Sequence, residues 1–115
     1  MKLNLENKTA LISGSTKGIG FAIAIELATE GARVIVNGRS ESAVASSIEQ
    51  ICKTVPKAKV EGFAGDLSTE KEAENLLKRF PEVDILVNNL GIYEAKPFEE
   101  ITDEEWRRFF EINVL

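Results

Sequence analysis

Histidine is absent from this chain, and cysteine and tyrosine occur once each, as Cys52 and Tyr93. Without histidine there is no Ser-His or Cys-His pair to activate a nucleophile, and the most common metal ligand in proteins is missing. A single cysteine cannot form an internal disulfide. Because Cys52 falls on the apolar side of a helical pattern, we expect a buried, unreactive thiol.

Positive charge is also in the minority, since 14 lysines and arginines face 19 acidic residues and the formal net charge is −5. This balance argues against a nucleic acid or an anionic membrane as partner. The sequence has no apolar run long enough to span a bilayer, and its first residues lack the apolar stretch of a signal peptide. We therefore expect a cytoplasmic protein, whose 115 residues, 43% of them hydrophobic, suit one domain with a packed core.

The sequence does contain a regular alternation of strand-like and helix-like segments. Short apolar runs predict strands at residues 9–13, 33–37, 59–64 and 84–87. Helical periodicity and capping residues predict helices over 18–30, from Ser40 to Pro56, from Ser68 or Thr69 through Phe80, and from Thr102 to the end of the chain. Repeated β-α units imply an α/β fold with a parallel sheet and helices on both faces.

A glycine-rich turn joins the first predicted strand to the first predicted helix. Residues 13–20 read Ser-Gly-Ser-Thr-Lys-Gly-Ile-Gly. Glycines in this place let the backbone approach a phosphate, and the helix start offers free N–H groups and the positive end of its dipole. We expect Gly14 to permit the tight turn, Gly18 the phosphate approach and Gly20 close helix-to-strand packing. The spacing is G-x-x-x-G-x-G and departs from the general G-x-G-x-x-G, so the turn alone leaves open a helix start that binds nothing.

Polar residues also follow the other predicted strands, namely Arg39, Asp66 and Asn89. Ligands of parallel sheets bind beyond the carboxyl ends of the strands, so these groups and the glycine turn should meet on one rim, which favours a dinucleotide site. No acidic residue ends the second strand, where a domain that prefers NAD usually carries one. Arg39 is instead placed to bind a 2′-phosphate, with Lys17 as a second positive charge, so we expect NADP(H) as cofactor and NAD(H) as the alternative. The alternative that Arg39 is a solvated cation in a loop stays open.

Four segments resemble the classical short-chain dehydrogenase/reductase family, and the resemblance covers essentially the whole chain. They are residues 13–20, similar to the family's T-G-x-x-x-G-I-G with serine for threonine, the pair Asp66-Leu67, residues 88–91 (Asn-Asn-Leu-Gly, similar to N-N-A-G), and Asn113. The resemblance implies a Rossmann fold, here a partial, doubly wound parallel sheet with strand order 3-2-1-4. The resemblance and the residue pattern together imply a cofactor site made of Gly14, Ser15, Thr16, Lys17, Gly18, Ile19, Gly20, Arg39, Asp66, Leu67, Asn89 and Gly91.

The resemblance also implies individual roles. Asp66 and Leu67 are expected to hold the adenine, and the alternative that Asp66 is an acid favoured by the dipole at a helix start stays open. From their side chains, we expect Asn89 to bond the ribose and Asn88 to clamp neighbouring strands. Asn113, on the last predicted helix, joins the catalytic group. No metal site is implied.

The family's catalytic Ser and Tyr-x-x-x-Lys cannot be placed in this chain. Tyr93 is followed by Lys96 three residues later, not four, and then by Pro97, which indicates a loop. We therefore expect the N-terminal part of a longer reductase, inactive alone, that moves a hydride between NADP(H) and a carbonyl or alcohol substrate. A noncatalytic NADP-binding module and an interaction domain without a ligand are the alternatives.

The last predicted elements favour self-association. A sheet of four strands would leave the fourth strand unpaired at an edge, and Trp106, Phe109 and Phe110 would lack apolar partners. We therefore expect a homo-oligomer that forms through this edge or through the last helix.

Overall fold

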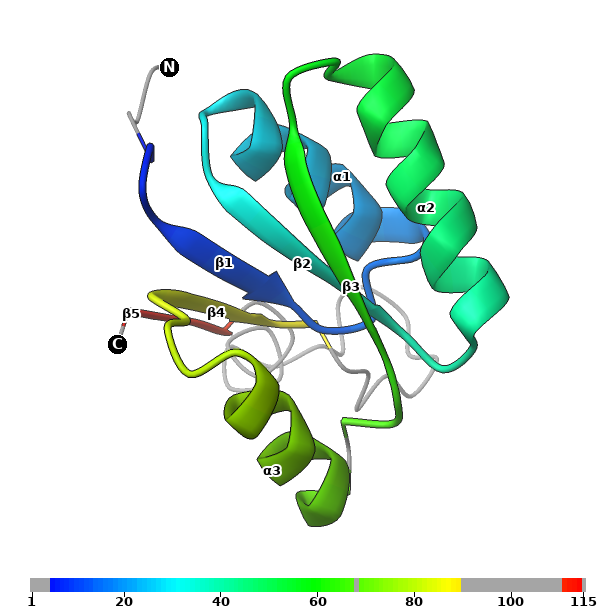
Figure 1. The fold of residues 1–115 in the computed structure, drawn as a ribbon, viewed down its shortest axis with the longest axis vertical. Coiled ribbons are helices and arrows are strands. Elements are labelled where there is room, and N and C mark those ends of the chain that lie inside the picture. The colour runs from blue at the N-terminus through cyan, green and yellow to red at the C-terminus, as the bar shows by residue number, and fades with distance from the viewer. Residues whose placement is uncertain (1–4, 68, 90–110, 115) are drawn as a thin grey trace, which may run out of the picture.

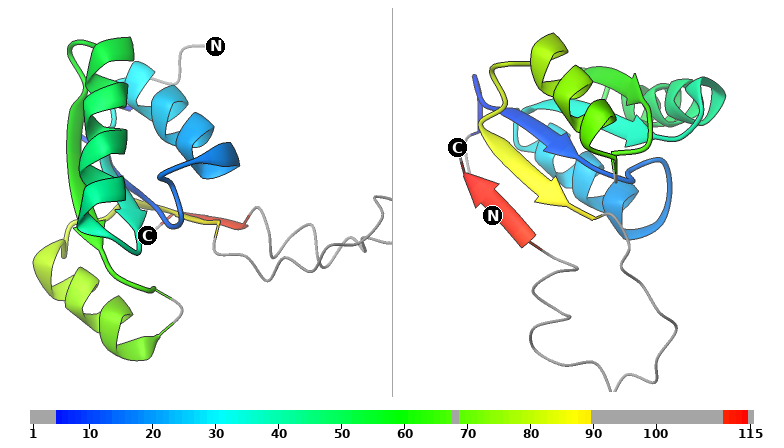
Figure 2. Two further views of the ribbon diagram at one scale, coloured as in Figure 1. Left: turned by 90° about the vertical axis from the view of Figure 1, so that its right-hand side faces the viewer. Right: turned by 90° about the horizontal axis from the view of Figure 1, so that it is seen from below.

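The structure, a computed structural model, describes residues 5–67, 69–89 and 111–114. A five-stranded sheet in the order β3-β2-β1-β4-β5 forms its centre (Figure 1). The helices α1 and α2 pack on one face of this sheet and α3 packs on the other (Figure 2). In chain order the elements are β1 (Thr9–Ile12), α1 (Gly18–Thr29), β2 (Arg33–Gly38), α2 (Glu41–Thr54), β3 (Lys59–Ala64), α3 (Glu70–Arg79), β4 (Ile85–Asn88) and β5 (Glu111–Val114).

The predicted parallel arrangement is confirmed. The strand β1 pairs in parallel with β2 and β4, and β2 pairs in parallel with β3. Alternate residues of β1 face opposite sides of the sheet, so Ala10 and Ile12 pack towards α1 and α2, while Leu11 packs towards α3. Burial on both faces explains the almost continuous apolar runs of β1 and β2.

The end of the chain differs from the sequence-based expectation. Residues 111–114 form β5, which pairs antiparallel with β4, so the predicted last helix is wrong over these residues. The remainder of that helix, with Trp106, lies outside the described residues. Asn113 therefore lies on a strand, opposite Leu86, and β4 is not an unpaired edge, which removes the basis for association through it. An unpaired strand offers a row of N–H and C=O groups, and the β-branched Ile112 and Val114 favour pairing with it over helix formation.

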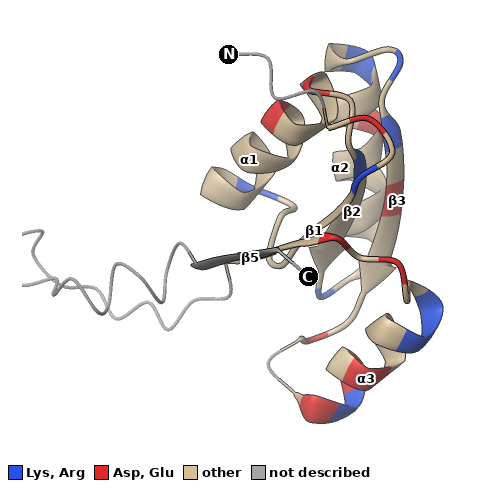
Figure 3. Cartoon of the chain, turned by 90° about the vertical axis from the view of Figure 1, so that its left-hand side faces the viewer, with Lys and Arg blue, Asp and Glu red and all other residues tan. Residues whose placement is uncertain are grey.

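Local signals set the helix ends as expected. Ser40 caps α2 by accepting a hydrogen bond from the N–H of Ala43 at 3.2 Å, and Thr69 caps α3 by accepting one from Glu72 at 3.3 Å. Acidic residues occupy the first turn of α3 and basic residues its last turn, which complements the helix dipole (Figure 3). None of the helices in the described part of the chain is both long and apolar enough to cross a membrane.

The prediction of a buried Cys52 is wrong, because its side chain is exposed on α2. The buried face of this helix carries Val44, Ser47 and Ile51. Cys52 follows Ile51, and one residue is a rotation of about 100° around a helix, which carries the thiol off the buried face.

Candidate nucleotide-binding site

The glycine turn lies between β1 and α1, at the edge of the sheet where the parallel strands end (Figure 1). Gly14 and Gly18 have φ angles of 57° and 66°, a left-handed conformation that other residues adopt at a cost. A Cβ atom on Gly18 would meet nothing within 4 Å, so the space in front of this residue is open. Both observations fit a backbone that a phosphate group can approach.

Gly20 fits its predicted role in close packing. A Cβ atom there would lie 2.5 Å from Nδ2 of Asn89 and 2.6 Å from the carbonyl oxygen of Gly14. The first turn of α1 therefore rests directly on the glycine turn and on the residue that follows β4. No side chain larger than hydrogen fits at this position without displacing backbone.

Ser15, one of the predicted site residues, uses its side chain inside the protein. Its side chain is fully buried, and Oγ donates to the carbonyl of Ile12 at 2.7 Å while accepting from the N–H of Asn37 at 2.9 Å. Because the single hydroxyl proton is used inside the protein, Ser15 fixes the turn against β2 instead of pointing outwards.

Asn89 also holds the turn. Its Nδ2 donates to the carbonyl of Gly14 at 3.2 Å, and its backbone N–H donates to Oγ of Ser13 at 2.8 Å. The Ser13 hydroxyl in turn lies 3.4 Å from Oδ1 of Asn88, a long contact that joins the ends of β1 and β4 as the predicted strand clamp would. Gly91 lies outside the described residues.

Several predicted site residues present exposed groups on the same rim. Lys17, Gly18, Ile19 and Arg39 are exposed, and Ile19 keeps 47% of its surface accessible although it is a large apolar residue. The helix α1 follows Lys17 without a side-chain cap on its first N–H groups, unlike α2 and α3. Uncapped N–H groups at a helix start are donors for an anion.

Thr16 connects the turn to α2. This residue is half-buried, and its carbonyl oxygen accepts a hydrogen bond from Oγ of Ser47 at 2.9 Å. This contact ties the glycine turn to α2, the helix that follows Arg39 in the chain.

The β3–α3 loop brings Asp66 and Leu67 to the end of β2. The N–H of Gly65, which precedes them, donates to the carbonyl of Gly38 at 2.9 Å. The carbonyl of Asp66 accepts from both the N–H and the hydroxyl of Thr69, and Leu67 packs against the core beneath α3. The structure therefore places the glycine turn, Arg39 and Asp66 on neighbouring strand ends, as the sequence predicts.

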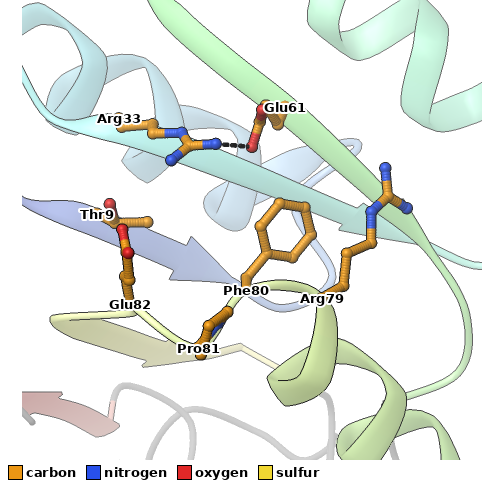
Figure 4. A pocket seen from close by; sticks show the side chains of 7 residues that line it. All are labelled: Thr9, Arg33, Glu61, Arg79, Phe80, Pro81 and Glu82. Carbon is orange, nitrogen blue, oxygen red and sulfur yellow. Dashed lines mark hydrogen bonds and ion pairs between the residues drawn. The ribbon is translucent and has the colours of Figure 1, made fainter.

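A separate cavity of about 390 Å³ lies near the starts of β1 and β2, at the opposite edge of the sheet (Figure 4). It holds the ion pair between Arg33 and Glu61, and the guanidinium of Arg79 lies 5.1 Å from the centre of the Phe80 ring. Because none of its lining residues belongs to the glycine turn, this cavity is not part of the candidate nucleotide site. Within residues 5–67, 69–89 and 111–114 no cluster of three or more His, Cys, Asp or Glu side chains could bind a metal ion.

Comparisons with known proteins agree with this architecture. Residues 8–115 match the family described as short chain dehydrogenase. The chain is 52% identical over 115 residues to the uncharacterized oxidoreductase YvaG of Bacillus subtilis (strain 168), a match that covers 100% of this chain and 44% of that protein.

Solved structures show the same likeness. A 3-oxoacyl (acyl-carrier-protein) reductase from Agrobacterium tumefaciens C58 with NADP bound is 32% identical, with a TM-score of 0.71 over 94% of this chain and 42% of that one. L-Sorbose reductase from Gluconobacter frateurii, complexed with NADPH and L-sorbose, is 30% identical, with a TM-score of 0.71 over 94% of this chain and 42% of that one. The chain thus spans less than half the length of each of these relatives, and it belongs to the short-chain dehydrogenase/reductase family.

Proposed function

We propose that this chain is the NADP(H)-binding portion of a reductase whose whole protein transfers a hydride between NADP(H) and a carbonyl or alcohol substrate. The observation that carries the proposal is the set of anion-binding groups at the carboxyl ends of the strands. Two left-handed glycines and the uncapped start of α1 lie beside the exposed Lys17 and Arg39. Backbone N–H groups suit a pyrophosphate, and a guanidinium suits a terminal phosphate.

The end of β2 favours NADP(H) over NAD(H). Its last residue is Gly38, and a Cβ atom there would lie 2.4 Å from Cγ2 of Thr16. The strand end therefore carries no acid for a ribose 2′-hydroxyl and has no space for one unless Thr16 moves. Arg39 follows directly and is exposed. The two reductases solved with NADP or NADPH support the same choice.

The remaining predicted residues have proposed places in this site. Asp66 and Leu67, next to the end of β2, would border the adenine, and Asn89 would serve the ribose while it also holds Gly14. Gly91 and Asn113 are proposed from the family motif, as part of the cofactor site and of the catalytic group. The bound cofactor would supply the hydride, and this part of the chain would bind and orient it.

Titration calorimetry with NADPH and NADH tests the proposal. The Arg39→Ala variant removes one exposed guanidinium, and loss of a charge-assisted contact with the 2′-phosphate, about 1.5–3 kcal/mol, would weaken NADPH binding by about 10- to 150-fold. NADH binding should change little because NADH has no 2′-phosphate. Arg79→Ala is the matched control, since it removes an exposed arginine at the other edge of the sheet. An equal loss for both cofactors would refute the role of Arg39, and a folded protein that binds neither would refute the proposed function.

A further inference from the structure

We propose that Asn37 is the positioning residue of the nucleotide site: its carboxamide fixes the glycine turn and the β3–α3 loop relative to each other and takes no part in selecting the cofactor. This inference rests on the proposed function, because it explains how the same rim is assembled. The sequence identifies Asn37 only as a position near the strand end without an acid.

The side chain of Asn37 joins three strand ends. Its Oδ1 accepts a hydrogen bond from the N–H of Gly14 at 3.0 Å. Its Nδ2 donates to the carbonyl oxygens of Phe63 and Gly65, both at 3.0 Å. The carboxamide thus uses its oxygen and both of its N–H groups, and it links the turn after β1 to the loop after β3 across β2.

The backbone of the same residue adds a second set of bonds. The N–H of Asn37 donates to Oγ of Ser15 at 2.9 Å, and its carbonyl accepts from the N–H of Ser15 at 2.8 Å. Asn37 is 1% exposed, so water does not compete for these contacts. Within the described part of the chain, no hydrogen-bonding side-chain atom is buried without a partner, so this arrangement is fully satisfied.

The loops that Asn37 joins are those that face the proposed ligand. Gly14 belongs to the phosphate turn, and Gly65 precedes Asp66 at the proposed adenine contact. The N–H of Gly65 also donates to the carbonyl of Gly38, beside Arg39. If this carboxamide is lost, the phosphate and adenine contacts can move independently, and a ligand that spans both must order them on binding.

An amide suits this position. Aspartate has nearly the same shape but no N–H donor, so it would remove the side-chain donor to the carbonyls of Phe63 and Gly65 and bury a negative charge. Position 37 lies 23 residues after Gly14, close to where an acid selects NAD in many dinucleotide-binding domains. Because the side chain here is buried between loops, an acid at position 37 would not reach a ribose.

The experiment compares four forms of the purified protein, the unmodified chain and the Asn37→Ser, Val34→Ala and Arg39→Ala variants, by calorimetric titration with NADPH and NADH. Val34 is the matched control, since it is fully buried in the same strand and packs in the apolar core. We expect Asn37→Ser, which removes the contacts without adding charge, to weaken the binding of both cofactors by the same factor, about tenfold or more, with an unchanged ratio of affinities. Val34→Ala should unfold at a lower temperature yet bind both cofactors almost unchanged below that temperature. Arg39→Ala should lower the affinity for NADPH relative to that for NADH.

A spectroscopic readout follows the proposed contact directly. In Asn37→Asp the backbone N–H of Gly14 keeps an acceptor, whereas in Asn37→Ser the shorter side chain removes it, so hydrogen exchange at Gly14 should accelerate only in the serine variant. If Asn37→Ser does not fold, the equally neutral Asn37→Ala replaces it in the titrations, with the same equal loss for both cofactors expected. Asn37→Asp serves only the exchange measurement, because its negative charge would repel the 2′-phosphate of NADPH.

Two results would overturn the inference. If the Asn37 variants lose no more cofactor affinity than Val34→Ala does at the same loss of folding stability, Asn37 only stabilises the core and does not position the site. A changed ratio of NADPH to NADH affinity would make Asn37 a selector. If the folded, unmodified protein binds neither cofactor, the proposed function fails, and hydrogen exchange at Gly14 still shows whether Asn37 fixes the turn.

Discussion

Replacing Gly20 by alanine should disrupt the nucleotide site although the new group is a single methyl. In the structure the methyl carbon would lie 2.5 Å from Nδ2 of Asn89, 2.6 Å from the carbonyl oxygen of Gly14 and 3.0 Å from Cα of Ser15. Two of these three atoms belong to backbone, which cannot rotate away as a flexible side chain does. The methyl would also separate Asn89 from the Gly14 carbonyl to which it donates at 3.2 Å.

The size of the effect follows from three contributions. Overpacking of a rigid site costs about 1–3 kcal/mol. Loss of the Asn89–Gly14 hydrogen bond adds about 0.5–1.5 kcal/mol. Alanine in place of glycine in a helix returns about 0.5–1 kcal/mol. We therefore expect the free energy of unfolding to fall by about 0.5–4 kcal/mol, and the melting temperature by several degrees for a domain of this size.

Thermal unfolding followed by circular dichroism measures this change, and calorimetric titration with NADPH follows the site. The Asn89→Ala variant sharpens the test because it removes one of the clashing atoms. In the Gly20→Ala, Asn89→Ala double variant the loss of stability should be smaller than the sum of the two single losses. A Gly20→Ala protein as stable as the unmodified protein would refute the close packing described here.

Three further perturbations test other parts of the structure. Ser15→Ala leaves the buried N–H of Asn37 without its acceptor and should lower the free energy of unfolding in urea by about 1–3 kcal/mol. The control Ser42→Ala, at an exposed position, should change it almost not at all, and equal effects would contradict the buried role of Ser15. Thr69→Ala removes the cap of α3 and should cost about 1 kcal/mol with faster hydrogen exchange at Glu72; unchanged exchange would contradict the cap. The exposed Cys52 should react with a thiol reagent in the folded protein as fast as in urea, and protection would contradict its exposure.

Much of the fold was predictable because its signals are local. Ser40 and Thr69 start helices through bonds to residues three positions later, and Gly31, with a φ of 96°, follows the end of α1 as a glycine at a helix end should. The parallel direction of the first four strands also follows from local information, since repeated β-α units favour parallel strands.

The errors lie where a partner distant in sequence decides the outcome. Cys52 was expected to be buried by its apolar character, yet the buried face of α2 includes the polar Ser47 instead. The Ser47 hydroxyl lies 2.9 Å from the carbonyl oxygens of both Thr16 and Ala43 and shares its one proton between them, and this pairing is what makes its burial acceptable. Similarly, residues 111–114 pair as a strand with β4, and helical periodicity within the segment does not reveal this distant partner.

The same distinction divides the polar residues of the site into two layers. Ser13, Ser15 and Asn37 are buried and bind one another's strands, whereas Lys17 and Arg39 are exposed. In the sequence both kinds lie at or just after strand ends, so their positions alone do not separate ligand contacts from residues that hold the rim. Only the pairing of Ser15 with Asn37, 22 residues apart, assigns the buried residues to holding the rim, which leaves the exposed cations and the uncapped start of α1 to meet a phosphate. Cofactor preference should therefore respond to changes in the exposed layer, and affinity for any dinucleotide to changes in the buried one.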